Sequence, residues 1–353
     1  MDNIFRYMKK KIAILGSTGS IGKNTINILK KDKKNIKIVL LTSNKNIKEI
    51  LKQQKIFNVQ NLIITDKSKF KIIKDISKKR NFKVYNNYEC LKKIFKNKID
   101  YVMAAITGIS GLEPTLKIIK YSKIIAIANK ESIVCAWNLV SKELRKNNTE
   151  FIPVDSEHFS IWEILKGFKI NNVEKIYITA SGGPLLNLPI KKINKISKRE
   201  TLKHPNWSMG KKISIDSCTM MNKVFEVIEA QRIFNLPSNK IEILVHPKSY
   251  LHSIVKFKNG TVKLLIHEAD MKIPIFNTLY GNTEKSINTK KINLKKLNNL
   301  NLQKPNLNKF PCLRLQKQIP SKISLFETVL VSANDEIVKY YLDGLIEYNQ
   351  ISQ

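Results

Sequence analysis

The sequence has few features of a secreted or membrane-spanning chain. No run of about 18 apolar residues occurs, and the first apolar stretch, Lys11 to Leu15, leads into a turn and not into a signal-peptide cleavage site. Cysteine is scarce, and its spacing matches neither CxxC nor a zinc motif, so we expect free thiols in a reducing compartment. The four cysteines are Cys90, Cys135, Cys218 and Cys312. We therefore expect a cytoplasmic protein without a membrane segment.

Arginine and acidic residues are also scarce. Lysine and arginine total 63 against 28 aspartates and glutamates, which gives a net charge of +35, yet only six of the basic residues are arginine. A strongly basic balance is typical of nucleic-acid-binding proteins, but those proteins favour clustered arginine, whereas the lysines here are spread along the whole chain. We therefore expect no nucleic-acid partner, and a positive field that attracts phosphorylated small molecules.

The first 150 residues alternate short apolar runs with amphipathic stretches. The apolar runs predict strands over residues 10–16, 36–42, 61–66, 100–106 and 123–128. Strands separated by helices are typical of a parallel, doubly wound α/β sheet. We expect this Rossmann-like, nucleotide-binding domain to span residues 1–150.

A glycine-rich turn follows the first predicted strand. Residues Gly16 to Gly22, GSTGSIG, have the spacing GxxGxxG and lead into a predicted helix. Backbone N–H groups at such a turn and the helix dipole bind a pyrophosphate, although a tight strand-to-helix connection alone would need similar glycines. After the second strand, Asn44, Lys45 and Asn46 stand where an NAD site has an acidic residue. Because a lysine and amides suit a 2′-phosphate, NADPH is the expected cofactor.

Beyond residue 150 the pattern changes to that of an α+β domain with its own sheet, expected to span residues 151–285. Strands are predicted over residues 151–154 and 174–180, and Asn259-Gly260 predicts the turn of an antiparallel hairpin over residues 252–268. Residues 286–309 are polar without periodicity and predict a linker. Helical spacing returns over residues 310–353, which we expect to form a short C-terminal helical domain.

One predicted helix, Asp216 to Glu229, carries polar side chains along a single line and apolar side chains around the rest of its surface. A helix with so much apolar surface should be buried, and burial of an unpaired lysine or glutamate would cost several kcal/mol. The line therefore predicts an internal site with an anion beside its lysine and a cation beside its glutamate. The polar line consists of Thr219, Asn222, Lys223 and Glu226.

Two further carboxylates follow the strand predicted over residues 151–154. Asp155 and Glu157 lie two residues apart, so in an extended chain their side chains point to the same side. Together with Glu226 they would offer three oxygen ligands, which suit Mg²⁺ or Mn²⁺. The alternative is that Asp155, Ser156 or Glu157 caps the next helix.

Two loops are rich in turn-forming residues. Residues 204–210, HPNWSMG, place His204 and Trp207 in a polar loop that predicts either a lid over a ligand or a structural loop. Residues 181–184, SGGP, offer Ser181 and backbone N–H groups, and predict either a phosphate-binding nest or a plain turn. Structural roles are expected for the three histidines in or beside the predicted strands, His246, His252 and His267.

These segments together resemble the 1-deoxy-D-xylulose 5-phosphate reductoisomerases, the NADPH-dependent enzymes of the non-mevalonate isoprenoid route. The resemblance covers the first 285 residues in order, and residues 204–229 form its most specific part. The shared segments read LGSTGSIG, ANKES, PVDSEH, SGGP, HPNWSMG, ISIDSCTMMNK and HPKSYLHS.

The resemblance implies a role for each matched residue. The metal ligands would be Asp155, Glu157 and Glu226. The NADPH contacts would be Thr18, Gly19, Ser20, Ile21, Asn44, Lys45, Asn46, Asn129, Glu131 and Gly210. The substrate contacts would be Lys130, Ser156, Glu157, Ser181, His204, Trp207, Ser217, Asn222, Lys223 and Glu226, with the phosphate held by Ser181, Ser217, Asn222 and Lys223. The catalytic residues would be Lys130, Asp155, Glu157, His204 and Glu226.

The implied reaction isomerises 1-deoxy-D-xylulose 5-phosphate and then reduces it with NADPH to 2-C-methyl-D-erythritol 4-phosphate, in a homodimer joined through the central sheet. The alternative is an NADP-dependent dehydrogenase of another small phosphorylated or semialdehyde substrate. A semialdehyde dehydrogenase would need an activated cysteine, and neither Cys135 nor Cys218 has an activating motif nearby. The chain departs from the family at Asn44, Cys218 and Val224, and its C-terminal helical region is shorter than is usual there.

Overall fold

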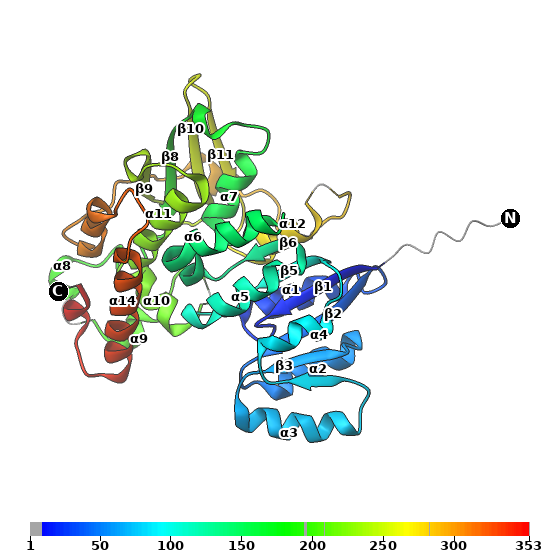
Figure 1. Cartoon of the computed structure of the whole chain (residues 1–353). Coiled ribbons are helices and arrows are strands. Elements are labelled where there is room, and N and C mark those ends of the chain that lie inside the picture. Colours follow the sequence, from blue (N-terminus) through cyan, green and yellow to red (C-terminus); the bar gives the residue numbers. More distant parts are fainter. Residues whose placement is uncertain (1–8, 194–195, 208, 282, 353) are drawn as a thin grey trace. The chain divides into compact units, whose positions relative to one another are not determined.

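The computed structural model describes residues 9–193, 196–207, 209–281 and 283–352. The chain divides into two units, which Figure 1 shows with their helices and strands. The first unit contains residues 1–132, 138–154 and 274–285, and the second unit contains residues 133–137, 155–273 and 286–353. Each unit is described by itself below.

The first unit is built on a seven-stranded sheet in which every neighbouring pair of strands is parallel. The strand order is β4-β3-β2-β1-β5-β6-β7, so the chain winds outward in both directions from β1 and β5. This is the predicted doubly wound α/β arrangement, and ligands of such sheets bind where the winding reverses. The strands are β1 (Lys10–Leu15), β2 (Ile36–Ser43), β3 (Asn61–Ile64), β4 (Lys83–Tyr85), β5 (Ile99–Ala104), β6 (Ser122–Ile127) and β7 (Glu150–Pro153).

Helices connect these strands, and side chains at their N-terminal ends fix several of the boundaries. Asn46, Asp66 and Asn129 each accept a hydrogen bond from a backbone N–H of the helix that follows. α12 packs against the sheet, where the Tyr101 and Thr278 hydroxyls are 2.7 Å apart. The helices are α1 (Ser20–Lys30), α2 (Ile47–Phe57), α3 (Lys67–Lys78), η1 (Tyr88–Cys90), α4 (Leu91–Ile94), η2 (Ile109–Gly111), α5 (Leu112–Ile119), α6 (Lys130–Lys146) and α12 (Lys272–Tyr280).

Strand β7 lies in a different sheet from the one predicted. Its sequence was expected to begin the second domain, but residues Glu150–Pro153 pair in parallel with β6 and complete the seven-stranded sheet. The physical reason is that α6 makes one more crossover connection, after which the buried side chains of Ile152 and Val154 continue the core of the first unit. The three-residue strand β4 was not predicted from the sequence.

The second unit contains a four-stranded mixed sheet in the order β11-β10-β8-β9. β10 runs antiparallel to β8 and β11, and β9 runs parallel to β8. The predicted hairpin is present, and Gly260 at its turn has a φ of +84°, which suits glycine. α7 packs against β10 and β11, whereas α11 packs against β8 and β9. The strands are β8 (Val173–Ala180), β9 (Ile241–Val245), β10 (Leu251–Phe257) and β11 (Val262–Ile266).

Helices and 3₁₀ turns make up much of the rest of the second unit, including the predicted helical region after residue 310. The helices are α7 (Ser156–Ile164), α8 (Ile190–Ile193), α9 (Lys198–Thr201), α10 (Lys211–Cys218), α11 (Met221–Phe234), α13 (Leu294–Asn298) and α14 (Phe326–Asp343). The 3₁₀ turns are η3 (Ile170–Asn172), η4 (Ser238–Lys240), η5 (Pro311–Gln318) and η6 (Tyr348–Ser352).

The single helix predicted over residues 216–229 is wrong, because the chain breaks there into α10 and α11. Met220 lies between them in the left-handed conformation, with φ +64° and ψ +11°. The Thr219 hydroxyl donates to the Ile215 carbonyl at 3.1 Å, a local bond of the kind that competes with regular helix. Buried apolar side chains on both sides of the break, including Ile215 and Phe225, hold the two helices in the core.

The segment 286–309, predicted as a linker, makes fixed contacts within the second unit. Gln303 and Val245 exchange backbone hydrogen bonds of 3.0 and 2.8 Å along the edge of β9.

The C-terminal helix α14 is attached to α10 and α11 by buried polar contacts. The buried Arg232 and Glu327 form an ion pair that joins α11 to α14. Asn334 of α14 also donates to Asp216 of α10 at 2.8 Å. The C-terminal region therefore supports the two helices that carry the predicted polar line.

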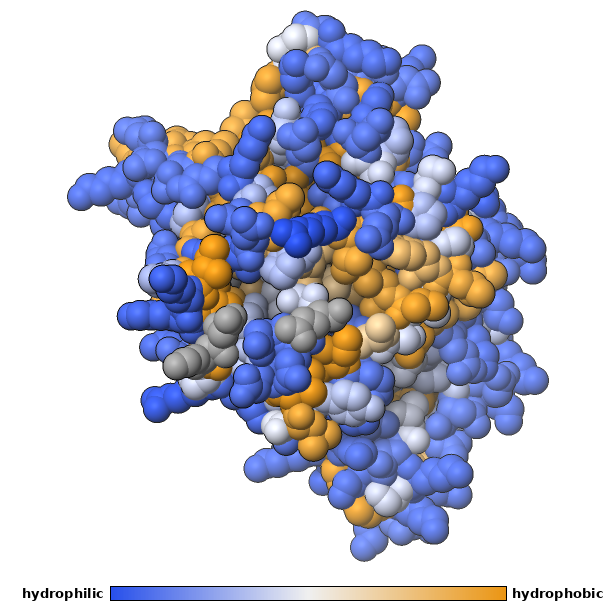
Figure 2. Space-filling model, turned by 90° about the vertical axis from the view of Figure 1, so that its left-hand side faces the viewer, coloured by the Kyte–Doolittle hydropathy of each residue, from blue (hydrophilic) through white to orange (hydrophobic). Residues whose placement is uncertain are grey.

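Hydrophilic residues cover most of the face shown in Figure 2, and hydrophobic patches lie between them. Within the described ranges, no helix combines the length and the apolar character needed to cross a membrane.

Candidate active site

Three carboxylates from two helices meet in the second unit. Asp155 and Glu157 lie at the start of α7, Glu226 lies in α11, and their ligand atoms are all within 4.8 Å of one another. Asp155 occupies the N-cap position of α7, yet its side chain makes no capping hydrogen bond. The cluster is therefore the oxygen-rich, closely spaced group expected for a hard cation such as Mg²⁺ or Mn²⁺. The two carboxylates of α7 reach it from the first turn of a helix, not from the extended chain predicted.

Lys223 lies within this cluster. Its ammonium donates to Glu157 Oε1 at 2.8 Å and to Glu226 Oε2 at 2.5 Å, and only 8% of its side chain is exposed. Burial raises the pKa of Glu157, and the nearby Glu226 carboxylate raises it further. Burial alone would lower the pKa of Lys223, but the charges of Glu157 and Glu226 outweigh that effect and raise it. The lysine is therefore the positive partner of two of the three carboxylates.

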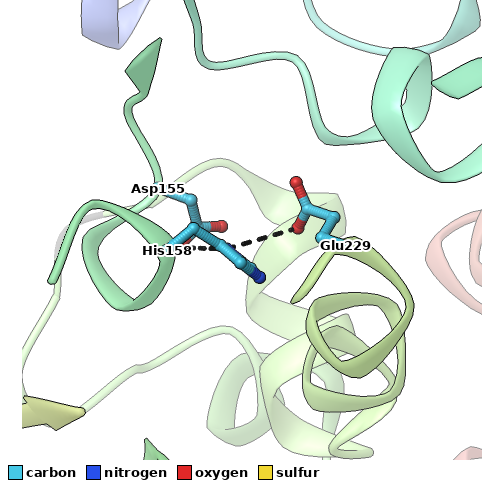
Figure 3. A group of neighbouring side chains, drawn as sticks. All are labelled: Asp155, His158 and Glu229. Atoms are coloured by element: carbon cyan, nitrogen blue, oxygen red, sulfur yellow. Dashed lines mark ion pairs between the residues drawn. The ribbon is translucent and has the colours of Figure 1, made fainter. Parts of the chain in front are cut away.

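A second group of possible ligands shares Asp155 with this cluster. Figure 3 shows His158 of α7 pointing toward Asp155 and toward Glu229 of α11, with Nδ1 at 4.0 and 3.8 Å from their carboxylate oxygens. The other ring nitrogen, Nε2, is 2.9 Å from the Glu226 carbonyl oxygen and must donate to it. Sequence reasoning missed both residues. The available signal was spacing, because each lies three residues after a predicted ligand on a helix.

Ser181 and His204 form a hydrogen-bonded pair at the end of β8. Ser181 Oγ lies 3.0 Å from His204 Nε2 and also accepts the Gly183 N–H at 3.0 Å. His204 Nδ1 accepts the backbone N–H groups of Asn206 and Trp207 at 3.1 and 3.0 Å. Burial lowers the pKa of His204 to about 4, with a smaller contribution from the Lys223 charge. The ring is therefore neutral, carries its proton on Nε2 and donates to Ser181.

The loop that follows His204 is attached to the strand β10 region. The Asn206 side-chain amide donates to the Pro247 carbonyl at 2.8 Å and to Ser249 Oγ at 2.9 Å. Trp207 is half-buried, and its ring meets that of His252 edge to face at 6.3 Å between centroids. Ser208, which belongs to the predicted lid, lies outside the described residues. The hydrogen bonds of Asn206 therefore hold in place the loop that carries Trp207.

Gly183 brings the turn after β8 against the end of α10. Its φ is +61°, and a Cβ at this position would lie 2.9 Å from the Ser217 carbonyl oxygen. Only glycine meets both conditions without strain. Ser181 and Ser217 are therefore on adjoining segments, while Asn222 and Lys223 begin α11 after the break at Met220. Ser156 opens α7 and donates to Glu157 Oε2 at 2.5 Å.

The glycine-rich turn of the first unit lies at the reversal point between β1 and β5. Gly16 has φ +75°, and a Cβ there would lie 2.6 Å from the Ala105 carbonyl oxygen. A Cβ at Gly22 would collide with the backbone of Gly16 and Ser17. These close approaches set the turn directly before α1, and the N-terminal N–H groups of a helix in this position suit a pyrophosphate. Thr18 Oγ1 lies 2.9 Å from Ser43 Oγ, and Gly19, Ser20 and Ile21 lead into α1.

The segment after β2 is exposed. Asn44 donates to Thr65 Oγ1 at 2.8 Å, and Asn46 accepts the Glu49 N–H at 3.1 Å and so caps α2. Lys45 lies between these two anchored residues. An exposed lysine on a fixed turn after the second strand suits the 2′-phosphate of NADPH.

The remaining candidates lie at helix starts. Asn129 caps α6 through Ser132 N at 2.6 Å, and its amide donates to the Gly108 carbonyl at 2.7 Å, so it braces the loop after β5. Lys130 and Glu131 are the first two residues of α6. Gly210 caps α10 in the second unit, whereas the other predicted cofactor residues lie in the first unit.

Cys218 is buried, and the histidines in or beside the second sheet, His246, His252 and His267, make structural contacts. Burial raises the pKa of Cys218 to about 12, so it is not a thiolate nucleophile. His246 contacts the Leu300 carbonyl. His252 and His267 stack at 3.7 Å between ring centroids.

Three family models of known proteins match the chain. The 1-deoxy-D-xylulose 5-phosphate reductoisomerase model matches residues 12–137. Its C-terminal domain model matches residues 151–234, and a second model named DXP reductoisomerase C-terminal domain matches residues 266–353.

Individual relatives are similar in sequence over nearly the whole chain. The chain is 59% identical to a 1-deoxy-D-xylulose 5-phosphate reductoisomerase of Pelagibacter ubique, over 97% of this chain and 89% of the relative. A relative of Clostridium perfringens is 39% identical over 98% of this chain and 90% of its own length.

Solved structures give the same result. The enzyme of Zymomonas mobilis in complex with NADPH has a TM-score of 0.88 at 32% identity, covering 98% of this chain and 90% of that one. A DOX-P reductoisomerase in complex with NADPH, fosmidomycin and magnesium has a TM-score of 0.89 at 32% identity, covering 97% and 87%.

Proposed function

The chain belongs to the 1-deoxy-D-xylulose 5-phosphate reductoisomerase family and is an NADPH-dependent oxidoreductase of isoprenoid precursor synthesis, and we propose the residues by which it acts. The reaction isomerises 1-deoxy-D-xylulose 5-phosphate and reduces the product to 2-C-methyl-D-erythritol 4-phosphate. The observation that carries the residue proposal is the meeting of three carboxylates with Lys223 and Asn222 on α7 and α11.

Asp155, Glu157 and Glu226 are proposed to hold Mg²⁺ or Mn²⁺. When bound, the cation acts as a Lewis acid toward the ketone and hydroxyl oxygens of the substrate. Three carboxylates spaced for one hard cation support this assignment. We assign Ser156 and Lys130 to contacts with the substrate near the reacting carbons.

The substrate phosphate is proposed to bind Ser181, Ser217, Asn222 and Lys223. Because His204 donates to Ser181 Oγ and Gly183 N–H donates to the same oxygen, the hydroxyl hydrogen of Ser181 is directed to a third partner. A phosphate oxygen is a suitable acceptor. His204 and the Trp207 loop would then cover the substrate and exclude water from it.

NADPH is proposed to bind the first unit and supplies the hydride. The narrow turn at Gly16 and Gly22 supports a pyrophosphate at Thr18, Gly19, Ser20 and Ile21. Asn44, Lys45 and Asn46 are assigned to the 2′-phosphate, and Asn129, Glu131 and Gly210 to the rest of the cofactor. On this proposal the first unit acts as the NADPH domain, the second unit as the catalytic domain, and residues 310–353 within the second unit as a helical support.

The protein is further proposed to be a cytoplasmic homodimer joined through the sheet of the second unit. Strand β11 is at one end of that sheet, and Val262 and Leu264 on it are 50% and 44% exposed. A second copy of β11 would bury these side chains and pair the strand edge. Leu264→Lys should convert a dimer to a monomer in light scattering, and an unchanged mass for a folded variant would contradict this interface.

The function is tested by NADPH oxidation with purified protein. Turnover should require 1-deoxy-D-xylulose 5-phosphate and a divalent cation, stop in excess EDTA and return with Mg²⁺ or Mn²⁺. Identification of 2-C-methyl-D-erythritol 4-phosphate by mass spectrometry completes the test. Equal turnover in excess EDTA would remove the metal assignment, and NADPH oxidation without this product would remove the reaction.

A further inference from the structure

Lys223 and Asn222 together engage both oxygens of Glu226. The Lys223 ammonium donates to Oε2 at 2.5 Å, and the Asn222 amide donates to Oε1. Lys223 also donates to Glu157 Oε1 at 2.8 Å. The two residues proposed to receive the substrate phosphate are thus hydrogen-bonded to two of the three carboxylates proposed to bind the metal.

A divalent cation and the Lys223 ammonium are alternatives at these oxygens. Three carboxylates within 4.8 Å repel one another unless a positive charge lies among them. Lys223 supplies one such charge. The pair is almost completely buried from solvent, since the Lys223 side chain is 8% exposed and that of Glu226 is 1% exposed. A cation held by Glu157 and Glu226 would compete with the ammonium for these oxygens and would repel it, which favours a lysine that turns away.

The position of Lys223 also suits its ammonium for binding a second anion. It lies in the first turn of α11, directly after the break that separates α11 from Ser217. Its charge contributes to the lowered pKa of His204, which donates to Ser181. The flexible four-carbon stem of a lysine allows its ammonium to move between neighbouring anions.

We propose that Lys223 and Asn222 are exchangeable positioning residues, which hold Glu157 and Glu226 together until a divalent cation takes these carboxylates and then transfer to the substrate phosphate. This inference rests on the proposed function of the site. It requires that cation and phosphate favour each other's binding, because each removes Lys223 from competition with the other.

The test measures Mn²⁺ affinity by electron paramagnetic resonance on the full-length protein, with and without saturating methylphosphonate as a phosphate surrogate. For the unmodified protein we expect methylphosphonate to tighten Mn²⁺ binding about fivefold or more, in the usual range of coupling between sites. In Lys223→Met, Mn²⁺ should bind more tightly without methylphosphonate, and the effect of methylphosphonate should vanish.

A purely structural lysine predicts the opposite sign. If Lys223 only tied α7 to α11, its loss would let the glutamates separate and weaken Mn²⁺ binding, which would overturn the proposal. Lys223→Gln provides a second variant that keeps a donor but removes the charge, and it should behave as Lys223→Met does. Unchanged coupling in either folded variant would also overturn the proposal.

Lys212 offers a matched control. It bridges Asp216 and Asp335 at 3.1 and 2.9 Å in the same unit, and neither of these carboxylates belongs to the proposed metal ligands. Lys212→Met should keep the methylphosphonate effect, whereas its loss there would show that the effect is not specific to Lys223. Because binding is measured without turnover, failure of this inference is distinguishable from absence of product in the activity assay.

Discussion

His204 Nε2 lies 3.0 Å from Ser181 Oγ, and the opposite ring nitrogen of His204 accepts two backbone N–H groups. The arrangement fixes one tautomer, because a nitrogen that accepts N–H groups cannot itself carry a proton. The histidine acts as a hydrogen-bond donor that aims Ser181, and protonation would break the two bonds to Nδ1.

The first prediction concerns this protonation. His204 should titrate near pH 4, well below the usual histidine value of about 6.5. Because the folded protein binds this proton less readily than the unfolded chain, its contribution to stability is lost as the pH falls from about 6.5 to 4. Two-dimensional NMR of the imidazole nitrogens checks the value, with His204→Gln to assign the signal. A midpoint at or above pH 6.5 would contradict the structure.

The second prediction concerns Gly183. Gly183→Ala should lower the free energy of unfolding by about 1–3 kcal/mol and raise KM, because the new Cβ meets both an unfavourable φ and the Ser217 carbonyl. Gly167→Ala is the matched control, since Gly167 has φ +78° but nothing lies within 4 Å of the added Cβ. Denaturant unfolding of both variants distinguishes the cost of the positive φ, which both share, from the cost of the steric collision with Ser217, which only Gly183→Ala has. Equal losses would show that the approach to Ser217 is unimportant.

The third prediction concerns cofactor choice. Lys45→Ala should raise KM for NADPH about tenfold and leave KM for NADH nearly unchanged, because the lost charge would contact only the 2′-phosphate. Lys48→Ala removes another exposed lysine, from α2, and should have little effect. Steady-state kinetics with both cofactors decide the matter. A parallel change with NADH would instead indicate a general effect of charge.

The fourth prediction separates the two ligand groups that share Asp155. Glu226→Gln should abolish turnover and weaken Mn²⁺ binding at least tenfold while NADPH binding remains measurable, because a neutral amide is a poorer ligand for a hard cation. Glu229→Gln should weaken Mn²⁺ binding less, since Glu229 belongs to the group with His158. Titration calorimetry measures both. A larger effect from Glu229→Gln would move the metal toward His158.

The fifth prediction concerns the C-terminal region. Glu327→Ala should destabilise the protein by about 3–5 kcal/mol, because it leaves the buried Arg232 without its charged partner. Glu336→Ala on the same helix is the control. Its partner Lys339 is 3.5 Å away and both side chains are more than half exposed, so the loss should stay below about 1 kcal/mol. Thermal unfolding compares the two, and similar losses would contradict the anchoring role of Arg232.

Sequence patterns correctly predicted those parts of the first unit whose local sequence is compatible with only one structure. The apolar run from Lys10, the glycine turn and the helix after it follow from strand periodicity and from steric limits at Gly16 and Gly22. The hairpin turn at Gly260 was predicted for the same reason. The positive φ of Gly16 and Gly260 and the contact of Gly22 with Gly16 depend on neighbouring residues, whereas the contact of Gly16 with Ala105 appears only in the folded chain.

Predictions failed where partners distant in the sequence decide the structure. A short apolar strand such as β7 fits either sheet, and only its pairing with β6 shows which one it joins. The break at Met220 opposes the helical spacing around it and depends on how α10 and α11 pack in the core. Spacing also could not show that Lys223 contacts Glu157, which lies 66 residues away in the sequence.

The left-handed residue at Met220 also limits how this part of the chain can vary. Met220 N donates to Ser217 O at 3.3 Å, and Lys223 N donates to Met220 O at 3.0 Å, so the turn has a set number of residues. One residue more or less would rotate α11 by about 100° relative to α10 and carry Glu226 away from Asp155. Between Ser217 and Glu226 only the positions outside the proposed binding residues can exchange side chains, and the segment cannot change length, so natural variants should show substitutions at those positions without insertions or deletions.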